Sequence, residues 1–319
     1  MNKLIEIIKK EFQVELTKEP FHMLDLGCSG GISADWRLLE PYLRVIGIDL
    51  NVEEVEKLNK QEKNKAIKYH AGNLELSPDH PIRTARGTPF VCESHKIFAK
   101  TSAWDAHYRS QENKNPLSNR SRPDYANIEK ILQENKYAHV DFIKIDVDGP
   151  DFDILMALES SLAQLQVLAF KLEVNFNGTT NPSDHTFHNM DRLMRKNGFE
   201  LYDLSVRRYT KNALPGRFEG DFFGQTITGA VTQGDAVYFL NQNPPALSLA
   251  KNIKQITLMT LSNQIDSAAQ LLLSLDVRES FKKSFLDTAA LMQGYKTYRD
   301  LLSQWKERPE SFFHKNHKE

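Results

Sequence analysis

Several short segments rich in apolar residues are spread over the first 240 residues of the chain, and those at residues 21–26 and 45–50 are compact apolar runs that end in polar or glycine residues. Apolar runs of this length are typical of strands that lie buried in the middle of a sheet. We therefore predict strands at residues 21–26, 45–50, 67–74, 140–147, 167–176, 199–209 and 236–240.

Segments with helical periodicity alternate with these runs. They lie at residues 52–64, 125–135, 153–165 and 185–198, and a further one at residues 4–12 precedes the first strand. Strands that alternate with helices favour right-handed crossovers, which place helices on both faces of a largely parallel sheet. The pattern predicts an α/β fold with a mostly parallel seven-stranded sheet.

Two parts of the chain break this alternation. Residues 77–122 hold several prolines and no sustained period, and so long an irregular stretch is typical of a substrate loop or lid. After Pro244 and Pro245, apolar residues recur at helical spacing. We therefore expect an N-terminal helix in residues 1–20, a main α/β domain over 21–243 and a helical extension over 246–319. The apolar faces of the extension would pack on the main domain or form a homodimer.

Composition narrows the class of protein. Of 319 residues, 40% are hydrophobic and 26% are charged, as in ordinary globular proteins. Lys and Arg total 41 against 42 for Asp and Glu, so the net charge of −1 lacks the basic excess of most nucleic-acid-binding proteins. The first residues do not form a signal peptide, no apolar run reaches the roughly 18 residues of a membrane span, and the only cysteines are Cys28 and Cys92. We expect a cytoplasmic protein that binds no nucleic acid.

The turn after the first predicted strand is rich in small residues. It reads Asp-Leu-Gly-Cys-Ser-Gly-Gly over residues 25–31, and Gly27, Ser29 and Gly31 allow a tight turn and close approach to a ligand. Nucleotide enzymes also use a glycine turn, but Asp25 would repel a pyrophosphate. S-adenosylmethionine (SAM) has no phosphate, and an acid can bind the ammonium group of its methionine part. The turn therefore favours SAM over NAD.

Two further polar residues follow the next two strands. Asp49 comes about 20 residues after the turn, where a carboxylate can accept hydrogen bonds from both hydroxyls of a ribose. It could instead cap the helix that follows. Asn73 follows the third strand and could contact the adenine edge, although Gly-Asn is also a common turn sequence. Both residues join the glycine turn as candidate cofactor-binding positions.

The densest acidic segment, at residues 146–153, follows the fourth predicted strand. Ligands bind beyond the carboxyl ends of the strands in an open α/β sheet, so this segment belongs at the site. Glu173 and Asn175 end the fifth strand at the same edge, and with Asp146 they offer the oxygen ligands that suit Mg²⁺. Asp151 and Asp153 are better explained as caps of the following helix.

Residues 142–155 read Phe-Ile-Lys-Ile-Asp-Val-Asp-Gly-Pro-Asp-Phe-Asp-Ile-Leu and resemble the strand, turn and helix signature of FkbM-type methyltransferases. Residues 234–239 resemble the last strand of that family, and the glycine turn and Asp49 also match. Asp148 stands where the family usually has Glu. The resemblance covers about residues 21–240. It implies a Rossmann-like class I methyltransferase fold and transfer of a methyl group from SAM to oxygen, often a hydroxyl of a sugar or a natural product.

Methyl transfer to a hydroxyl requires an aligned acceptor oxygen and a group that weakens its hold on the proton. A metal held by Asp146 could lower the pKa of the hydroxyl, which makes Asp146 a candidate catalytic residue. His95 and His107, in the predicted lid, are alternative catalytic bases, and His185 follows the fifth strand. A lone histidine more often has a plain surface role than a catalytic one. Lys144 could orient Asp146 or reach solvent.

The leading hypothesis is a SAM-dependent O-methyltransferase that acts on a sugar, a glycan or a glycosylated natural product, with Mg²⁺ as a candidate second cofactor. An NAD-linked oxidoreductase would share the glycine turn and Asp49, but the chain lacks the third glycine of the dinucleotide fingerprint. A SAM-binding scaffold without activity, for example in a glycan assembly complex, would not need the acidic segment at residues 146–153.

Overall fold

The computed structural model describes residues 1–77, 79–82, 123–147, 149–178, 180–209, 229–241 and 247–306. Nearly all of the predicted lid lies outside the described residues, and so do His95, His107 and Asp148. Contacts between residues divide the chain into two compact units. One comprises residues 21–33 and 43–241, and the other comprises residues 1–20, 34–42 and 242–319.

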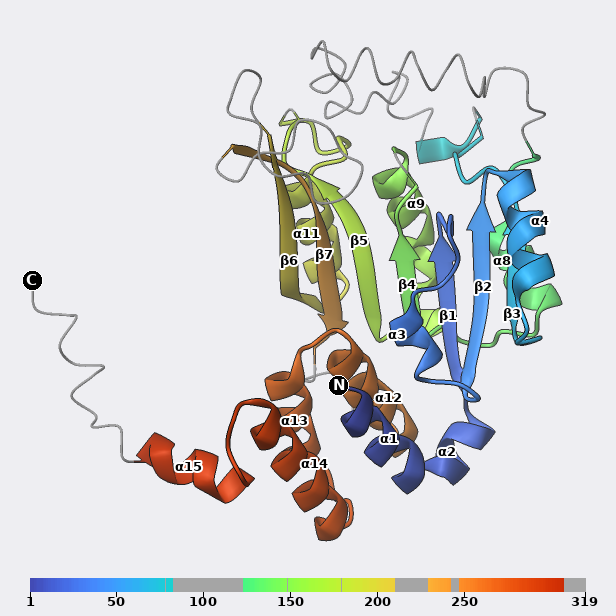
Figure 1. Ribbon diagram of the computed structural model, residues 1–319. Coiled ribbons are helices and arrows are strands. Elements are labelled where there is room, and N and C mark those ends of the chain that lie inside the picture. The colour runs from blue at the N-terminus through green and yellow to red at the C-terminus, as the bar shows by residue number, and fades with distance from the viewer. Residues whose placement is uncertain are drawn as a thin grey trace, which may run out of the picture. The chain divides into compact units, whose positions relative to one another are not determined.

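The first unit is built on a single seven-stranded sheet (Figure 1). Its strands are β1 (Phe21–Leu26), β2 (Leu43–Asp49), β3 (Ile67–Ala71), β4 (Phe142–Ile145), β5 (Ala169–Asn175), β6 (Phe199–Tyr209) and β7 (Ala230–Leu240). They are arranged in the order β3-β2-β1-β4-β5-β7-β6. Strand β7 is antiparallel to both of its neighbours, whereas the pairs from β3 to β5 are parallel. The expected mostly parallel seven-stranded sheet is therefore confirmed, although β7 begins at Ala230 rather than at residue 236.

One face of this sheet forms the main hydrophobic core. Alternate strand residues such as Leu24, Ile46, Ile143 and Leu172 point into it and are fully or almost fully buried. They pack against apolar residues from the helices α8 (Ile128–Glu134), α9 (Asp151–Leu158) and α11 (Phe187–Lys196). Two short pieces, η2 (Glu159–Ser161) and α10 (Leu162–Leu165), continue α9. Burial of continuous apolar strands beneath helices explains why the sequence shows compact runs instead of alternation.

Helix α4 (Val52–Gln61) contacts β2 and β3. The side chain of Asn59 holds it there, because its Nδ2 donates to the Tyr69 carbonyl at 2.8 Å and its Oδ1 accepts from the Tyr69 N–H at 3.1 Å. At the other end, Asn51 caps the helix by accepting from the Glu54 N–H at 3.2 Å. These bonds fix the loop that leads out of β2, where Asp49 lies.

The second unit is helical. Its elements are α1 (Asn2–Glu11), α2 (Gln13–Lys18), α3 (Ala34–Arg37), α12 (Leu249–Leu261), α13 (Ile265–Ser274), α14 (Glu279–Met292) and α15 (Tyr298–Lys306). Helix α1 packs on α12 and α14, and the rings of Phe12 and Phe281 meet edge to face at 5.0 Å. The buried Lys254 pairs with Glu19 at 3.2 Å and donates to the Pro20 carbonyl at 2.9 Å. Among the described helices none has the length and apolar character needed to cross a membrane.

Candidate active site

The glycine turn after β1 passes directly over the end of β4. The Gly27 N–H donates to the Ile48 carbonyl at 2.9 Å, and a Cβ atom at Gly27 would lie only 1.8 Å from the Asp146 carbonyl oxygen. Gly27 also has a φ of +82°, a conformation that residues with a side chain rarely adopt. Gly30 has a φ of +77° but open space around it, and Ser29 beside it is exposed. The turn therefore needs Gly27 for close packing, while its tip is accessible to a ligand.

Three charged side chains meet beneath this turn, and we name them the Asp25–Lys144–Asp146 cluster. The Lys144 Nζ lies 3.3 Å from the Asp25 Oδ1 and 3.3 Å from the Asp146 Oδ2. It also donates a hydrogen bond to the Gly27 carbonyl at 2.9 Å. The parallel register of β1 and β4 places Asp25 directly beside Lys144. Of the two roles considered for Lys144, orienting Asp146 is therefore the one that the structure supports.

Burial sets the charge state of this cluster. It raises the pKa of Asp25 from 3.8 to about 6, an effect that Lys144 opposes and that the nearby Asp146 and Asp49 reinforce. For Lys144, burial alone would lower the pKa, but Asp25 and Asp146 raise it above its usual value. The Asp25 Oδ1 is buried, and the described donor nearest to it is the Lys144 Nζ at 3.3 Å. A bound cation would therefore share this carboxylate with Lys144.

The other predicted cofactor residues lie at the same edge of the sheet. Asp49 ends β2, and its Oδ1 accepts from the Asn51 N–H at 2.8 Å. The helix that follows is capped by Asn51, so the alternative role of Asp49 as that cap is wrong. Asn73 is buried, and its Oδ1 accepts from the Glu75 N–H at 3.0 Å, which holds a turn. The assignments of Asp49 to a ribose and of Asn73 to an adenine stay predictions.

The acidic turn after β4 is held by Asp151, in a way that sequence reasoning missed. This side chain is fully buried and accepts from the Val147 N–H at 2.9 Å and the Gly149 N–H at 3.0 Å. The N-cap residue of α9 is Pro150, which makes no side-chain cap hydrogen bond, and both acids lie in the first turn of the helix. Both acids therefore lie at the N-terminal end of the helix as predicted, and Asp151 also binds the turn that precedes the helix. Its role is to shape the backbone that follows Asp146.

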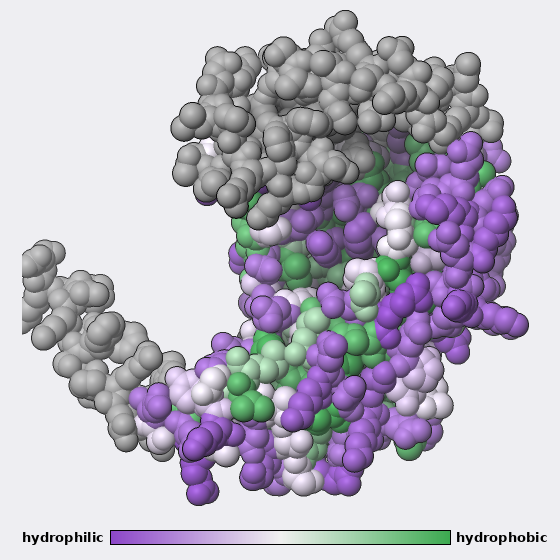
Figure 2. Space-filling view, viewed as in Figure 1, coloured by the Kyte–Doolittle hydropathy of each residue, from purple (hydrophilic) through white to green (hydrophobic). Residues whose placement is uncertain are grey.

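Farther along the sheet, β5, β7 and β6 carry a group of polar side chains that we name the polar patch. It consists of Glu173, Asn175, Arg207 and Asp235. Arg207 lies between two of the acids, with its Nη1 3.3 Å from the Glu173 Oε1 and its Nη2 3.5 Å from the Asp235 Oδ2. The strand register pairs Glu173 with Asp235, and it pairs Gln233 of β7 with both Asn175 and Arg207. Paired residues lie on the same face of a sheet, so the four side chains of the polar patch share one face. Figure 2 shows hydrophilic residues gathered over the upper part of the sheet in this view.

The predicted Mg²⁺ ligands do not form a set of donors that suits this ion. Asp146 is paired with Lys144, and Glu173 is paired with Arg207, so each carboxylate already faces a cation. The Asn175 Oδ1 is buried and lacks a hydrogen-bond partner among the described residues, but one neutral oxygen does not make a site. A dication at these carboxylates would also face the positive charges of Lys144 and Arg207.

His185 is buried rather than on the surface, so the expected plain surface role is wrong for this residue. Its Nδ1 lies 3.1 Å from the Gly149 carbonyl oxygen and 3.2 Å from the Asn175 Nδ2. Its Nε2 lies 3.2 Å from the Glu173 carbonyl oxygen. The ring therefore connects the turn after β4 to the end of β5, and it positions the polar patch relative to Asp146.

A family model of the FkbM methyltransferase domain matches residues 39–201, just over half of the chain. The chain belongs to the FkbM methyltransferase family. It is accordingly a SAM-dependent methyltransferase. The match includes Asp49, the segment around Asp146 and the end of β5, whereas the glycine turn and β7 lie outside it. No curated protein sequence matches the chain significantly.

Three solved structures to which this FkbM methyltransferase is similar are themselves methyltransferases. The O-methyltransferase from Bacillus cereus in complex with S-adenosylhomocysteine is 12% identical, with 73% of this chain and 80% of that chain covered and a TM-score of 0.35. The TehB-like SAM-dependent methyltransferase from Corynebacterium glutamicum is 11% identical, with 75% and 88% covered and a TM-score of 0.31. The precorrin-6y C5,15-methyltransferase from Geobacter metallireducens is 11% identical, with 72% and 87% covered and a TM-score of 0.34. Scores this low say nothing about the methyl acceptor, which has to be argued from this chain's own residues.

Proposed function

We propose that this FkbM methyltransferase methylates a hydroxyl group of a sugar, a glycan or a glycosylated natural product, and that it does so without Mg²⁺. The observation that carries the proposal is the polar patch on the same face of the sheet as the Asp25–Lys144–Asp146 cluster. Lys144 pairs in register with Lys171 on β5, and Glu173 is the next residue along β5 on that face. Carboxylate, amide and guanidinium groups side by side suit an acceptor that carries several hydroxyls.

The cofactor end of the site would be formed by the residues after β1 and β2. Asp25 would accept hydrogen bonds from the ammonium group of the methionine part, and it would share its carboxylate between that group and Lys144. Asp49 would bind the ribose hydroxyls, and Asn73 would contact the adenine. SAM supplies a methyl group that is already activated by its sulfonium. The protein therefore has to align the acceptor oxygen and receive its proton.

Asp146 is the described carboxylate that we propose for this proton. Its side chain is 38% exposed, so a bound molecule can reach it, while Lys144 fixes the position of its Oδ2 at 3.3 Å. The buried Glu173, oriented by Arg207, would accept a hydrogen bond from a second hydroxyl of the acceptor. His95 and His107 remain alternative bases by sequence alone. In this proposal Asp146 receives the proton of the acceptor hydroxyl, and the polar patch recognises the rest of the acceptor.

Calorimetry with SAM, S-adenosylhomocysteine and NAD tests the cofactor. We expect both adenosyl compounds to bind and NAD to give no heat. Binding of NAD alone would contradict the proposal.

An acceptor screen tests the reaction. Labelled SAM is incubated with sugars, glycans, glycosylated natural products, the matching aglycones and peptides, and the methylated atom is located by mass spectrometry. We expect transfer to hydroxyl oxygen in the sugar-bearing compounds only, and Glu173→Gln to lower it. Asp203→Asn is the matched control, because Asp203 is an exposed acid on β6 outside the patch. Transfer to aglycones or peptides would refute the proposed class of acceptor. Turnover that EDTA abolishes and Mg²⁺ restores would refute methyl transfer without a metal.

A further inference from the structure

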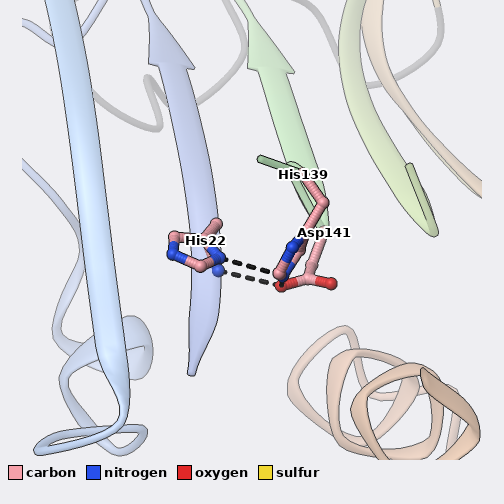
Figure 3. A group of neighbouring side chains, drawn as sticks. All are labelled: His22, His139 and Asp141. Carbon is pink, nitrogen blue, oxygen red and sulfur yellow. Dashed lines mark hydrogen bonds and ion pairs between the residues drawn. The ribbon is translucent and has the colours of Figure 1, made fainter. Parts of the chain in front are cut away.

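A second polar cluster lies at the opposite ends of β1 and β4, away from the candidate active site. It consists of His22, the second residue of β1, and of His139 and Asp141, which come directly before β4 (Figure 3). Along the strand, His22 is three residues from Asp25, a separation of about 10 Å. The proposed methyl transfer uses none of these three residues.

The spacing of the side-chain atoms is that of metal ligands. The His22 Nδ1 lies 3.0 Å from the His139 Nε2, and the His139 Nε2 lies 3.6 Å from the Asp141 Oδ2. All of the ligand atoms lie within 4.8 Å of one another. Around a tetrahedral Zn²⁺ with bonds of about 2.0–2.1 Å, neighbouring ligand atoms lie about 3.3 Å apart. Among the residues that the structure describes, this is the one group of three His, Cys, Asp or Glu side chains with such spacing.

The sheet itself holds the three residues in place. The Asp141 N–H donates to the His22 carbonyl at 2.8 Å, and the Asp141 Oδ2 accepts from the His22 N–H at 2.9 Å. The His22 ring also packs against the ring of Tyr137, with centroids 4.4 Å apart. A carboxylate oxygen that accepts a backbone hydrogen bond still has lone pairs for a metal. The sheet therefore fixes the backbones of His22 and Asp141 side by side, and His139 completes the group.

Burial and donor chemistry indicate which ion would fit. His22 and Asp141 are buried, while the His139 side chain is 16% exposed and provides the path from solvent. Two imidazole nitrogens and one carboxylate oxygen suit Zn²⁺, whereas Mg²⁺ prefers oxygen ligands. We propose that His22, His139 and Asp141 bind one Zn²⁺, with water as the fourth ligand. The ion ties the start of β1 to the segment before β4 and acts on stability, not on methyl transfer.

A simpler explanation is that the two histidines share a proton at 3.0 Å and bind no metal. Titration of metal-free full-length protein with Zn²⁺, followed by calorimetry, separates the two. We expect one Zn²⁺ per chain in the wild type and a higher thermal midpoint when Zn²⁺ is in excess. His139→Asn should weaken binding by more than the roughly 10–100-fold that loss of an outer-shell partner costs. His188→Asn is the matched control, because His188 is an exposed histidine on α11, and it should bind Zn²⁺ like the wild type.

Two further measurements keep the proposal testable if His139→Asn folds poorly. Co²⁺ in the wild-type protein should give the visible absorption bands of a tetrahedral site, and Zn²⁺ should abolish these bands. Glu173→Gln should leave Zn²⁺ affinity unchanged, since Glu173 lies at the other end of the sheet. The proposal is overturned if wild-type protein binds no Zn²⁺, if Co²⁺ gives only octahedral bands, or if Glu173→Gln removes the binding that His139→Asn leaves intact. These outcomes do not depend on the methyl acceptor.

Discussion

Strands β1 and β4 carry a polar cluster at each end, and the two clusters are built differently. At the carboxyl ends, Lys144 separates two carboxylates, and Asp146 is 38% exposed. At the amino ends, His22 and Asp141 are buried, and only the His139 side chain reaches the surface, at 16% exposure. In the first cluster the Lys144 ammonium group balances the carboxylates, whereas the second cluster brings together three side chains that can each ligate a metal ion.

The backbone explains the difference. After β1 the chain turns through Gly27 with a positive φ, and it leaves an open tip at Gly30. Before β4 the two strands are already side by side, because the Asp141 N–H donates directly to the His22 carbonyl. The same pair of strands thus offers an accessible end, which suits a ligand that must be exchanged in every turnover. The other end is closed, which suits a ligand that is retained.

The largest effect is expected from Gly27→Ala, which would break the accessible end. A Cβ atom there would lie 1.8 Å from the Asp146 carbonyl oxygen, and the φ of +82° adds strain. We expect a loss of about 3 kcal/mol or more in the free energy of unfolding, together with loss of SAM binding. Chemical denaturation and calorimetry measure both. Gly30→Ala meets no atom within 4 Å at a similar φ and should cost only about 1–2 kcal/mol; equal losses in the two variants would contradict the close packing.

Asp25→Asn comes next and sharpens the role of charge at that end. Loss of a charge-assisted hydrogen bond of about 1.5–3 kcal/mol should weaken SAM binding by roughly 10- to 100-fold at neutral pH. Calorimetry in the two proteins measures this. Asp203→Asn, which removes an exposed acid elsewhere, should leave SAM affinity unchanged. If the two variants bind SAM equally well, Asp25 does not hold the ammonium group.

The pH dependence of SAM binding follows from the same residue. Because burial raises the pKa of Asp25 to about 6, its carboxylate gains charge only as the pH rises through that value. Affinity for SAM should therefore fall about tenfold per unit as the pH drops below about 6, and the slope should vanish in Asp25→Asn. The sign is opposite for the stability of the ligand-free protein. Its folded state takes up the proton more readily than its unfolded state, so this group makes the fold less stable as the pH rises from 3.8 to about 6.

Lys144→Met tests whether the cation keeps the two carboxylates in place. Its removal leaves Asp25 and Asp146 facing each other without a counter-charge, so we expect a loss of about 1–3 kcal/mol in the free energy of unfolding at neutral pH. The pH at which SAM binding weakens should also move upward. Lys171→Met, at the neighbouring register position on β5, is the matched control and should change neither quantity appreciably. A Lys171 effect as large as that of Lys144 would argue for a general loss of positive charge.

The smallest effect is expected from Arg207→Lys in the polar patch. Lysine keeps the charge but cannot contact Glu173 and Asp235 at once in the way that the guanidinium does. With an acceptor identified by the screen, its KM should rise several-fold while SAM affinity and the thermal midpoint stay unchanged. A change confined to kcat would instead place Arg207 with the reacting atoms.

Local patterns in the sequence predict much of the cofactor end. β1 begins and ends at the predicted residues, because a buried parallel strand is mostly apolar even though His22 and Asp25 interrupt this one. Asp25, Asp49 and Asp146 each come at the end of such a run, so their convergence follows from parallel strand order. Asp151 looked like a helix cap because it begins a helix, but its carboxylate bonds to two N–H groups of the preceding turn, and nothing in the local pattern indicates that.

The other clusters depend on pairings that no local pattern contains. His22 and His139 are separated by 117 residues and meet only because β4 lies beside β1. Arg207 reaches Glu173 only because β7 enters the sheet between β5 and β6. A signal that could have found Arg207 is a basic residue near the end of a strand that lies close to strands carrying acids. That signal has meaning only when the strand order is known.

The insertion of β7 has a consequence for how the chain assembles during synthesis. β5 is complete at Asn175, but the strand that covers its edge runs from Ala230 to Leu240. At roughly 5–20 residues per second, the edge of β5 stays open for several seconds while the rest emerges from the ribosome. An open strand edge can pair with another chain, so this interval is when chaperone protection matters most. The half of the sheet that carries Asp25 and Asp146 can form before β7 is synthesised, and the half that carries Glu173 and Arg207 is completed last.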